Sequence, residues 1–263
     1  MLIDKQKGLI GSKSLNTIVR LVRGKYHQEN RPIYVLDLGC GKGKFANLIS
    51  QIPETFVFGV DIDDRSIRIA KQECKTSNCH YMLGNVEDMG IKSKFDIIVC
   101  TDVIEHLYHP DQFVHGMCQL LENQGIILLG VPNGYGPFEL ISHFRKWLGR
   151  VIAVLGVKKI FRDMQKKMLD RVAVVQSCNL DSVHVQTFSI PKVKKLFQKN
   201  GFRITGITNL SFVLIALLLN TPLGIIASPS TKLFRIFEFV DGLVVDFVPW
   251  FCSGSWLLRI EKI

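Results

Sequence analysis

The feature that most constrains this chain is a glycine-rich segment, VLDLGCGKGKF, at residues 35–45. A short apolar run precedes three glycines at alternate positions, Gly39, Gly41 and Gly43, and an apolar-periodic stretch follows from Phe45. This order predicts a buried strand, a tight turn without side chains and the start of a helix. Glycine suits such a turn because its backbone adopts positive φ and lets a ligand approach closely. In open α/β sheets, nucleotides bind at this place, beyond the carboxyl end of a strand.

An acid two residues before the first glycine limits the kind of nucleotide. The dinucleotide fingerprint G-x-G-x-x-G needs a third glycine at position 44, where this chain has Lys44. A carboxylate at Asp37 would also repel a pyrophosphate, whereas it suits a ligand that carries an ammonium group and a sulfonium. The segment therefore favours an adenosyl sulfonium compound over a dinucleotide.

Three later segments keep the spacing of a nucleotide-binding fold. VFGVDID at residues 57–63 predicts a second buried strand that ends in Asp61, 18 residues after Gly43. An acid at this spacing is placed to accept hydrogen bonds from ribose hydroxyls. MLGNVEDM follows at residues 82–89, and FDIIVCTDVIEHLYHP follows at residues 95–110.

Together these segments resemble the class I S-adenosylmethionine-dependent methyltransferases, and residues 95–110 resemble the ubiquinone-biosynthesis O-methyltransferase group. The resemblance implies S-adenosyl-L-methionine as methyl donor and S-adenosyl-L-homocysteine as product. It implies adenine contacts near Asn85, where the family usually has Asp. Cys40 can alternatively be a small filler of the turn. The implied cofactor-binding residues are Asp37, Gly39, Cys40, Gly41, Gly43, Asp61, Ile62, Asn85, Val86 and Thr101.

Strand-like and helix-like segments alternate along the chain. Strands are predicted at about residues 33–38, 56–61, 79–83, 95–100, 125–131, 202–207 and 255–260. Helices are predicted at about residues 13–25, 43–51, 64–77 and 110–122, and after an N-cap at Ser189. This alternation predicts an α/β fold with a Rossmann-like, doubly wound, mainly parallel sheet of seven strands. The family resemblance implies that the last strand is antiparallel.

The chain is expected to form a single methyltransferase domain over residues 1–263. Its expected parts are a leading helix at 1–30, a cofactor-binding half at 31–136, a basic amphipathic lid insertion at 137–183 and a C-terminal half at 184–263. In the lid insertion, apolar residues recur every three to four positions with basic clusters between them. This pattern is typical of a lid over a substrate and of a helix at a membrane interface.

A second insertion, at residues 209–250, is apolar and aromatic-rich. Its run at 210–227 is broken by Asn220 and Pro222, and is too short and interrupted for a membrane-spanning helix. An interfacial or re-entrant hairpin is one interpretation. A buried extension of the core and a homodimer interface are the others.

The formal charge of +10 lies outside the cofactor-binding half. Residues 137–171 hold nine basic and three acidic residues, whereas residues 31–136 hold nine basic and thirteen acidic ones. An anionic membrane surface or an anionic substrate explains this distribution. Nucleic acid is disfavoured as a partner, because basic residues are not interleaved with aromatic ones and no RNA-binding module is present.

The cysteines and the N-terminus favour a cytoplasmic protein, and the two insertions favour peripheral contact with a membrane. Seven scattered cysteines without a C-x-x-C pair indicate free thiols in a reducing compartment. The first residues contain no apolar region of the secretory kind. No metal site is expected, since Cys74, Cys79 and His80 lack a second pair of ligands.

Candidates for the chemistry lie at the same edge as the glycine turn. An acceptor hydroxyl needs a base, and we expect it among His106, His184 and Glu105, with His109 as a further candidate. Glu105 and His106 could alternatively ligate a divalent ion, as the resemblance implies.

The favoured function is O-methylation of a hydrophobic or membrane-associated small molecule, such as a quinone precursor, a lipid or a lipid-linked sugar. One alternative is a methyltransferase that acts on a polar metabolite, a glycan or RNA, in which the apolar segment forms a homodimer. Another is a non-catalytic module that binds the cofactor and a partner.

Overall fold

The computed structural model describes residues 11–88, 90–136, 185–211, 236 and 240–263. The chain divides into two compact units. The sheet unit consists of residues 14–131, 183–207 and 257–263, and the insertion unit consists of residues 1–13, 132–182 and 208–256. The lid insertion at 137–183 and most of the apolar insertion fall outside the described residues, so their expected conformations remain predictions.

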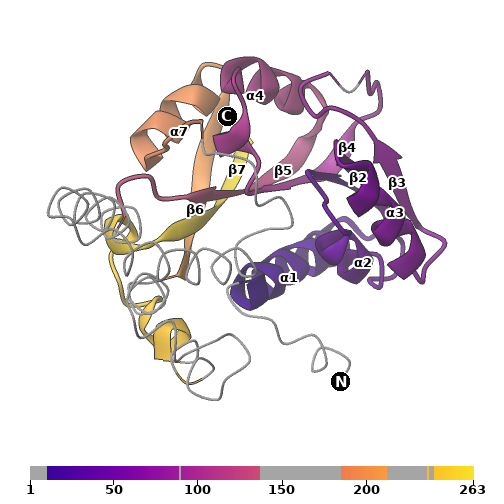
Figure 1. Cartoon of the computed structure of the whole chain (residues 1–263), viewed down its shortest axis with the longest axis horizontal. Helices are drawn as coiled ribbons and strands as arrows, with labels where there is room; N and C mark the ends of the chain where they lie inside the picture. Colours follow the sequence, from indigo (N-terminus) through magenta and orange to yellow (C-terminus); the bar gives the residue numbers. More distant parts are fainter. Residues whose placement is uncertain (1–10, 89, 137–184, 212–235, 237–239) are drawn as a thin grey trace, which may run out of the picture. The chain divides into compact units, whose positions relative to one another are not determined.

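Seven strands form one sheet with the order β3-β2-β1-β4-β5-β7-β6 (Figure 1). The neighbouring pairs among β1 to β5 are parallel. Hydrogen bonds from Ile263 to Gly201 and from Gly254 to Ser211 make β7 antiparallel to β6, as expected. The strands are β1 (Ile33–Leu38), β2 (Thr55–Asp61), β3 (Cys79–Leu83), β4 (Phe95–Thr101), β5 (Leu121–Pro132), β6 (Phe202–Ser211) and β7 (Ser255–Lys262).

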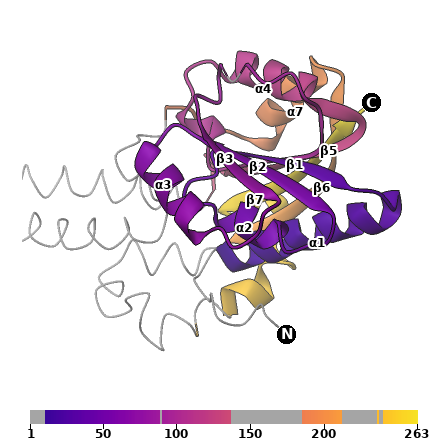
Figure 2. The same cartoon turned by 90° about the vertical axis from the view of Figure 1, so that its right-hand side faces the viewer.

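Helices cover both faces of the sheet. Figures 1 and 2 show α4 and α7 together over one face and α1 and α2 over the opposite face. This arrangement confirms the doubly wound α/β fold. The described helices are α1 (Gly11–Glu29), α2 (Lys44–Ile49), α3 (Asp64–Glu73), α4 (Pro110–Gln119), α7 (Ile190–Gln198) and the 3₁₀ turns η2 (Ile104–His106) and η3 (Trp250–Cys252). Among the residues that the structure describes, no helix is long and apolar enough to cross a membrane.

The central strands are buried from end to end. Ile97, Ile98, Val99 and Cys100 of β4 have no exposed surface. A parallel strand covered on both faces reads as a continuous apolar run, and this is why β1 and β4 could be located from the sequence.

Two helix caps also follow the sequence. Asp63 accepts hydrogen bonds from the backbone N–H groups of Arg65 and Ser66 and caps α3. Ser189 accepts one from Lys192 and caps α7. Each cap satisfies N–H groups that the first helical turn cannot pair by itself.

Strand β5 starts earlier than predicted, at Leu121 instead of residue 125. Its residues 122–124 are exposed and polar, so this part of the strand has no apolar pattern in the sequence. Phe95 pairs with Leu121 and Ile97 with Ile126, so the register shifts between Phe95 and Ile97. The irregular start of β5 therefore has no periodic signal.

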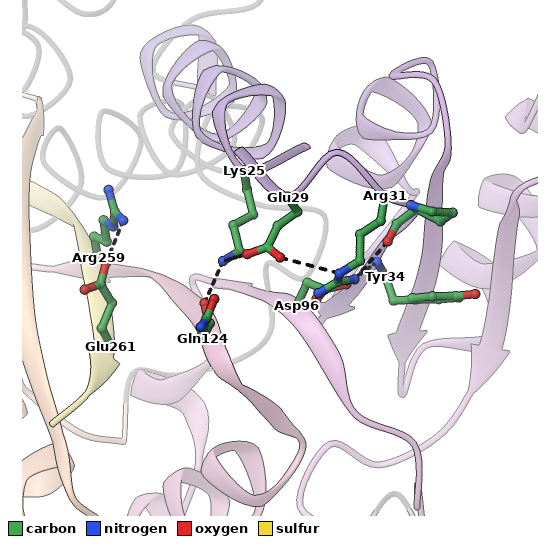
Figure 3. A network of polar contacts seen from close by, with 9 residues as sticks. Lys25, Glu29, Arg31, Tyr34, Asp96, Gln124, Arg259 and Glu261 are labelled. Carbon is green, nitrogen blue, oxygen red and sulfur yellow. Dashed lines mark hydrogen bonds and ion pairs between the residues drawn. The ribbon is translucent and has the colours of Figure 1, made fainter. Parts of the chain in front are cut away.

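A polar network joins the amino ends of the central strands, away from the glycine turn (Figure 3). The Arg31 guanidinium donates to both carboxylate oxygens of Asp96, at 2.6 and 3.2 Å. Asp96 also accepts the backbone N–H of Tyr34 at 2.8 Å. Asp96 is buried, so these bonds satisfy a carboxylate that water cannot reach.

The same network fixes the end of helix α1. Buried Lys25 donates to Glu29 at 2.6 Å and to the carbonyl of Gln124 at 2.7 Å. Glu29 in turn lies 3.4 Å from the guanidinium of Arg31. The leading helix is thereby tied to the starts of β1, β4 and β5 (Figure 3).

We expect Asp96→Ala to lower the free energy of unfolding by about 2 kcal/mol, because hydrogen bonds to a buried charged group are lost. Urea unfolding measures the change. Arg68→Ala is the control, since it removes an exposed ion pair with Asp64 and should cost less than about 1 kcal/mol. Equal effects of the two substitutions would contradict a structural role for Asp96.

Candidate methyl-donor site

The glycine turn follows β1, and its three glycines have φ values of 71°, 51° and 77°. A Cβ on Gly39 would lie 2.2 Å from Val103, and one on Gly43 would lie 2.3 Å from the Tyr81 hydroxyl. Packing within the protein therefore requires glycine at both positions. A Cβ on Gly41 would meet no atom within 4 Å. The open space beside Gly41 is where a ligand can approach the backbone.

Asp61 connects the end of β2 to this turn. One carboxylate oxygen accepts the backbone N–H of Gly41 at 2.7 Å, and the other accepts that of Asp63 at 2.8 Å. Each carboxylate oxygen has a second lone pair. Asp61 can therefore hold the turn in place and still accept hydrogen bonds from a ligand's hydroxyl groups.

Asp37 lies before the turn, at the end of β1, and is only 1% exposed. Its Oδ2 atom has no hydrogen-bond partner among the described residues. Burial is the main cause that raises the pKa of Asp37 to about 7; a hydrogen bond from the Ala46 backbone opposes this rise, and the charge of Asp61 contributes to it. An unsatisfied buried carboxyl group is a suitable partner for a ligand's ammonium group, so the residues here fit a cationic methyl donor.

The residues expected to contact adenine lie at the ends of β2 and β3. The two strands pair through Asp61 and Leu83. Ile62 is 68% exposed, which is unusual for an isoleucine and leaves its side chain open to a planar base. The Asn85 side-chain oxygen accepts the N–H of Glu87 at 3.0 Å. Its NH₂ group is therefore the part that can bind a base, beside the half-buried Val86.

Two other predicted cofactor-binding residues have different environments. Cys40 is buried, and burial raises the pKa of its thiol. The thiol fills space in the turn, so Cys40 can offer a ligand little besides its backbone. Thr101 ends β4, and its side chain lies against Gly130 of β5. A Cβ added to Gly130 would lie 2.8 Å from the Thr101 methyl group.

Glu105, in η2, is a buried acid. It is 1% exposed, and its Oε2 atom has no hydrogen-bond partner in the described part of the chain. Burial raises the pKa of Glu105 to about 8, and the charge of Asp102 contributes to the rise. Asp102 itself has a φ of 55°, a conformation that non-glycine residues rarely adopt. Strained backbone of this kind is frequent at functional sites.

The predicted histidines lie near Glu105 in the chain. His106 follows it in η2, and its side chain is partly exposed. The backbone carbonyl of Glu105 accepts the N–H groups of Val185 and Gln186 at 2.9 and 3.0 Å. His184 lies outside the described residues, but the next residue in the chain is thus tied to the loop after β4.

Some residues around the turn were not identified from the sequence. Tyr81 of β3 donates from its hydroxyl to Asn47 at 2.7 Å and lies over Gly43, and Val103 lies over Gly39. Neither position carries a local signal, because its partner is distant in the chain. In the described ranges, no group of three or more His, Cys, Asp or Glu residues could hold a metal ion, and the cysteines are free thiols.

Comparison with known proteins gives the family of this chain. The sequence model described as "Methyltransferase domain" matches residues 30–201, and the chain belongs to this family. Within it, the chain is of the class I type, for which S-adenosylmethionine is the methyl donor.

Its relatives include the ubiquinone biosynthesis O-methyltransferase of Salmonella enteritidis PT4, with 29% identity over 136 residues. The match covers 50% of this chain and 51% of the relative, so the chain spans about half the length of the curated relatives it matches.

Solved methyltransferases share the fold. Magnesium protoporphyrin IX methyltransferase from Synechocystis PCC 6803, solved with bound SAH, is 14% identical, with a TM-score of 0.52 over 96% of this chain and 85% of that chain. An O-methyltransferase from a Brevibacillus brevis trans-AT PKS multienzyme is 14% identical, with a TM-score of 0.54 over 92% of this chain and 71% of that one.

The raised pKa of Glu105 predicts a pH-dependent stability. Between the ordinary value of 4.5 and about 8, the folded chain keeps a proton that the unfolded chain releases, so stability falls as the pH rises. We expect Glu105→Gln to reduce this fall, by at most about 1.4 kcal/mol per pH unit. Urea unfolding from about pH 5 to 9 measures it. Glu73→Gln, at an exposed position, should behave as the wild type. Parallel curves for all three proteins would argue against a protonated Glu105.

Proposed function

We propose that this protein transfers the methyl group of S-adenosylmethionine to an oxygen atom of a hydrophobic or membrane-associated small molecule, such as a quinone precursor, a lipid or a lipid-linked sugar. The observation that carries the proposal is the glycine turn, with buried Asp37 before it and Asp61 bonded to Gly41. The name of the Salmonella relative supports a quinone-type acceptor. The apolar run at 210–227 supports a hydrophobic one.

Each group around the turn has a role in holding the donor. Asp61 accepts the ribose hydroxyls, and Asp37 faces the ammonium group. Ile62 covers one side of the adenine, and Asn85 and Val86 contact its edge. The donor, when bound, supplies a methyl group that is already electrophilic. The chain must mainly align the acceptor oxygen and exclude water.

The loop after β4 manages the acceptor's proton. His106 is the proposed base, because an imidazole accepts a proton near neutral pH. Glu105 holds its own proton up to about pH 8, given its raised pKa, and keeps η2 bound to residues 185 and 186 through its carbonyl. His184, next to Val185 in the chain, is the alternative base.

The free thiols of the described cysteines support a reducing compartment such as the cytoplasm. The basic residues at 137–171 support contact with an anionic membrane surface. A homodimer is a further arrangement that the apolar insertion allows.

Asp61→Asn tests the donor site. The substitution replaces one acceptor oxygen with an NH₂ group, so affinity for S-adenosylhomocysteine should fall about ten- to a hundred-fold. Titration calorimetry measures the affinity, and thermal unfolding checks that the turn remains folded. Asp64→Asn, at the exposed start of α3, is the matched control and should bind as the wild type. Unchanged affinity in Asp61→Asn would remove Asp61 from the site.

The acceptor is tested by incubation with labelled S-adenosylmethionine and a lipid extract, followed by mass spectrometry. We expect label in an apolar product, and His106→Ala should lower turnover at least about ten-fold while donor affinity stays the same. Label only in a polar metabolite, a glycan or RNA would overturn the hydrophobic acceptor. Bound donor with no product from any extract would favour a non-catalytic module.

A further inference from the structure

One tight turn in the insertion unit connects three distant segments. The turn comprises residues 250–254, just before β7. The Asn133 side chain donates to the carbonyls of Phe251 and Ser253 at 3.1 and 2.8 Å, and its backbone N–H donates to Gly254 at 2.9 Å. Ser211, at the end of β6, accepts from the Ser253 hydroxyl at 3.0 Å and from the Gly254 N–H at 2.9 Å.

Both insertions therefore start next to residues that are bonded to this turn. Gly136 precedes the basic insertion, and a Cβ there would lie 2.8 Å from the carbonyl of Ser253. Ser211 lies at the start of the apolar run, and a Cβ on Gly254 would lie 2.8 Å from the Ser211 hydroxyl. The close approaches leave no room for side chains, so the exits of the two insertions are fixed side by side.

The turn and the chain just before it carry apolar side chains that face solvent. Leu243, Phe247 and Phe251 are exposed at intervals of four residues, and Phe247 is 89% exposed. Asp241 and Val245 lie buried on the opposite side. Leu243 lies in a helical segment, Phe247 in the turn that follows it and Phe251 in η3, so three successive parts of the chain each present a large apolar side chain to solvent.

Hydrogen bonds hold this outward face in position. The Asn209 side chain donates to the carbonyls of Val245 and Val248 at 3.2 and 2.7 Å. Buried Trp256 donates from its indole N–H to the carbonyl of Trp250 at 2.6 Å. The exposure of the large apolar residues is thus built into the packing of the segment.

We propose that this surface docks onto an anionic lipid bilayer. The exposed apolar residues of this surface are Tyr135, Val240, Leu243, Phe247, Trp250 and Phe251. Exposed aromatic side chains are typical of protein parts that lie at the level of lipid headgroups. Charge supplies the complement, because the sequence that continues from Gly136 holds nine basic and three acidic residues at 137–171. The inference rests on the proposed function, since a bilayer presents a hydrophobic acceptor to the enzyme.

Vesicle flotation of the full chain, without methyl donor, tests the docking. Vesicles of phosphatidylcholine with phosphatidylglycerol are compared with phosphatidylcholine alone. We expect the wild type to float with the anionic vesicles and more weakly with the neutral ones. Phe247→Ser with Phe251→Ser should weaken binding at least about ten-fold, because two large apolar side chains no longer enter the interface.

The matched control is Tyr34→Ser with Ile263→Ser, which removes two exposed apolar side chains of the sheet unit, Ile263 being 75% exposed. This variant should float as the wild type does. Equal flotation of both double variants, or no flotation of the wild type, would overturn the proposal. So would a wild type that ignores vesicles and dimerises through this face, with the Phe247 and Phe251 variant monomeric in sedimentation.

These outcomes are separable from failure of the proposed function. A chain that binds S-adenosylhomocysteine in calorimetry and methylates a soluble acceptor, but ignores vesicles, keeps its methyltransferase activity and loses only the docking. A chain that floats with the vesicles but does not bind S-adenosylhomocysteine keeps the docking and loses the proposed function.

Discussion

The proposed donor site depends on the hydrogen bonds that the carboxylate of Asp61 accepts. The carboxylate bonds to Gly41 in the turn and to Asp63 at the start of α3. One side chain at the end of β2 thus sets the position of the backbone after β1 and of the next helix. Gly39, Gly41 and Gly43 have no side chains with which to hold the shape of the turn. A neighbouring strand has to hold it, and a charged acceptor does this with strong, directional bonds.

The site also concentrates buried acids. Asp37 and Glu105 are almost fully buried in the sheet unit, and each has an oxygen without a partner among the described residues. Burial raises both pKa values, and neighbouring carboxylates raise them further. Such an arrangement is unfavourable for the protein alone and favourable once a cation is bound. In the proposed donor site, pairing with a cationic ligand favours the ionised form of Asp37, which burial alone disfavours.

Much of the fold could be predicted because its signals are local. A buried parallel strand is a short apolar run, and a cap such as Asp63 precedes its helix directly. The glycine turn and the position of Asp61 at the end of β2 were predicted from the local residue pattern and its spacing. Tyr81 over Gly43 and Val103 over Gly39 could not be found, since each contact joins residues far apart in the chain. The pKa of Glu105 was equally hidden, because burial is a property of the folded molecule.

The turn at residues 250–254 has a consequence for how such an enzyme can diversify. The Asn133 amide donates to backbone carbonyls of the turn, and the Ser253 hydroxyl donates to the Ser211 carbonyl. These bonds hold the residues from which both insertions start, and they do not depend on the sequence of the insertions. Loops of other lengths and compositions can then be exchanged there during evolution without altering the strands or the glycine turn. If the insertions recognise the acceptor as proposed, acceptor recognition is separable from the strands that carry the glycine turn.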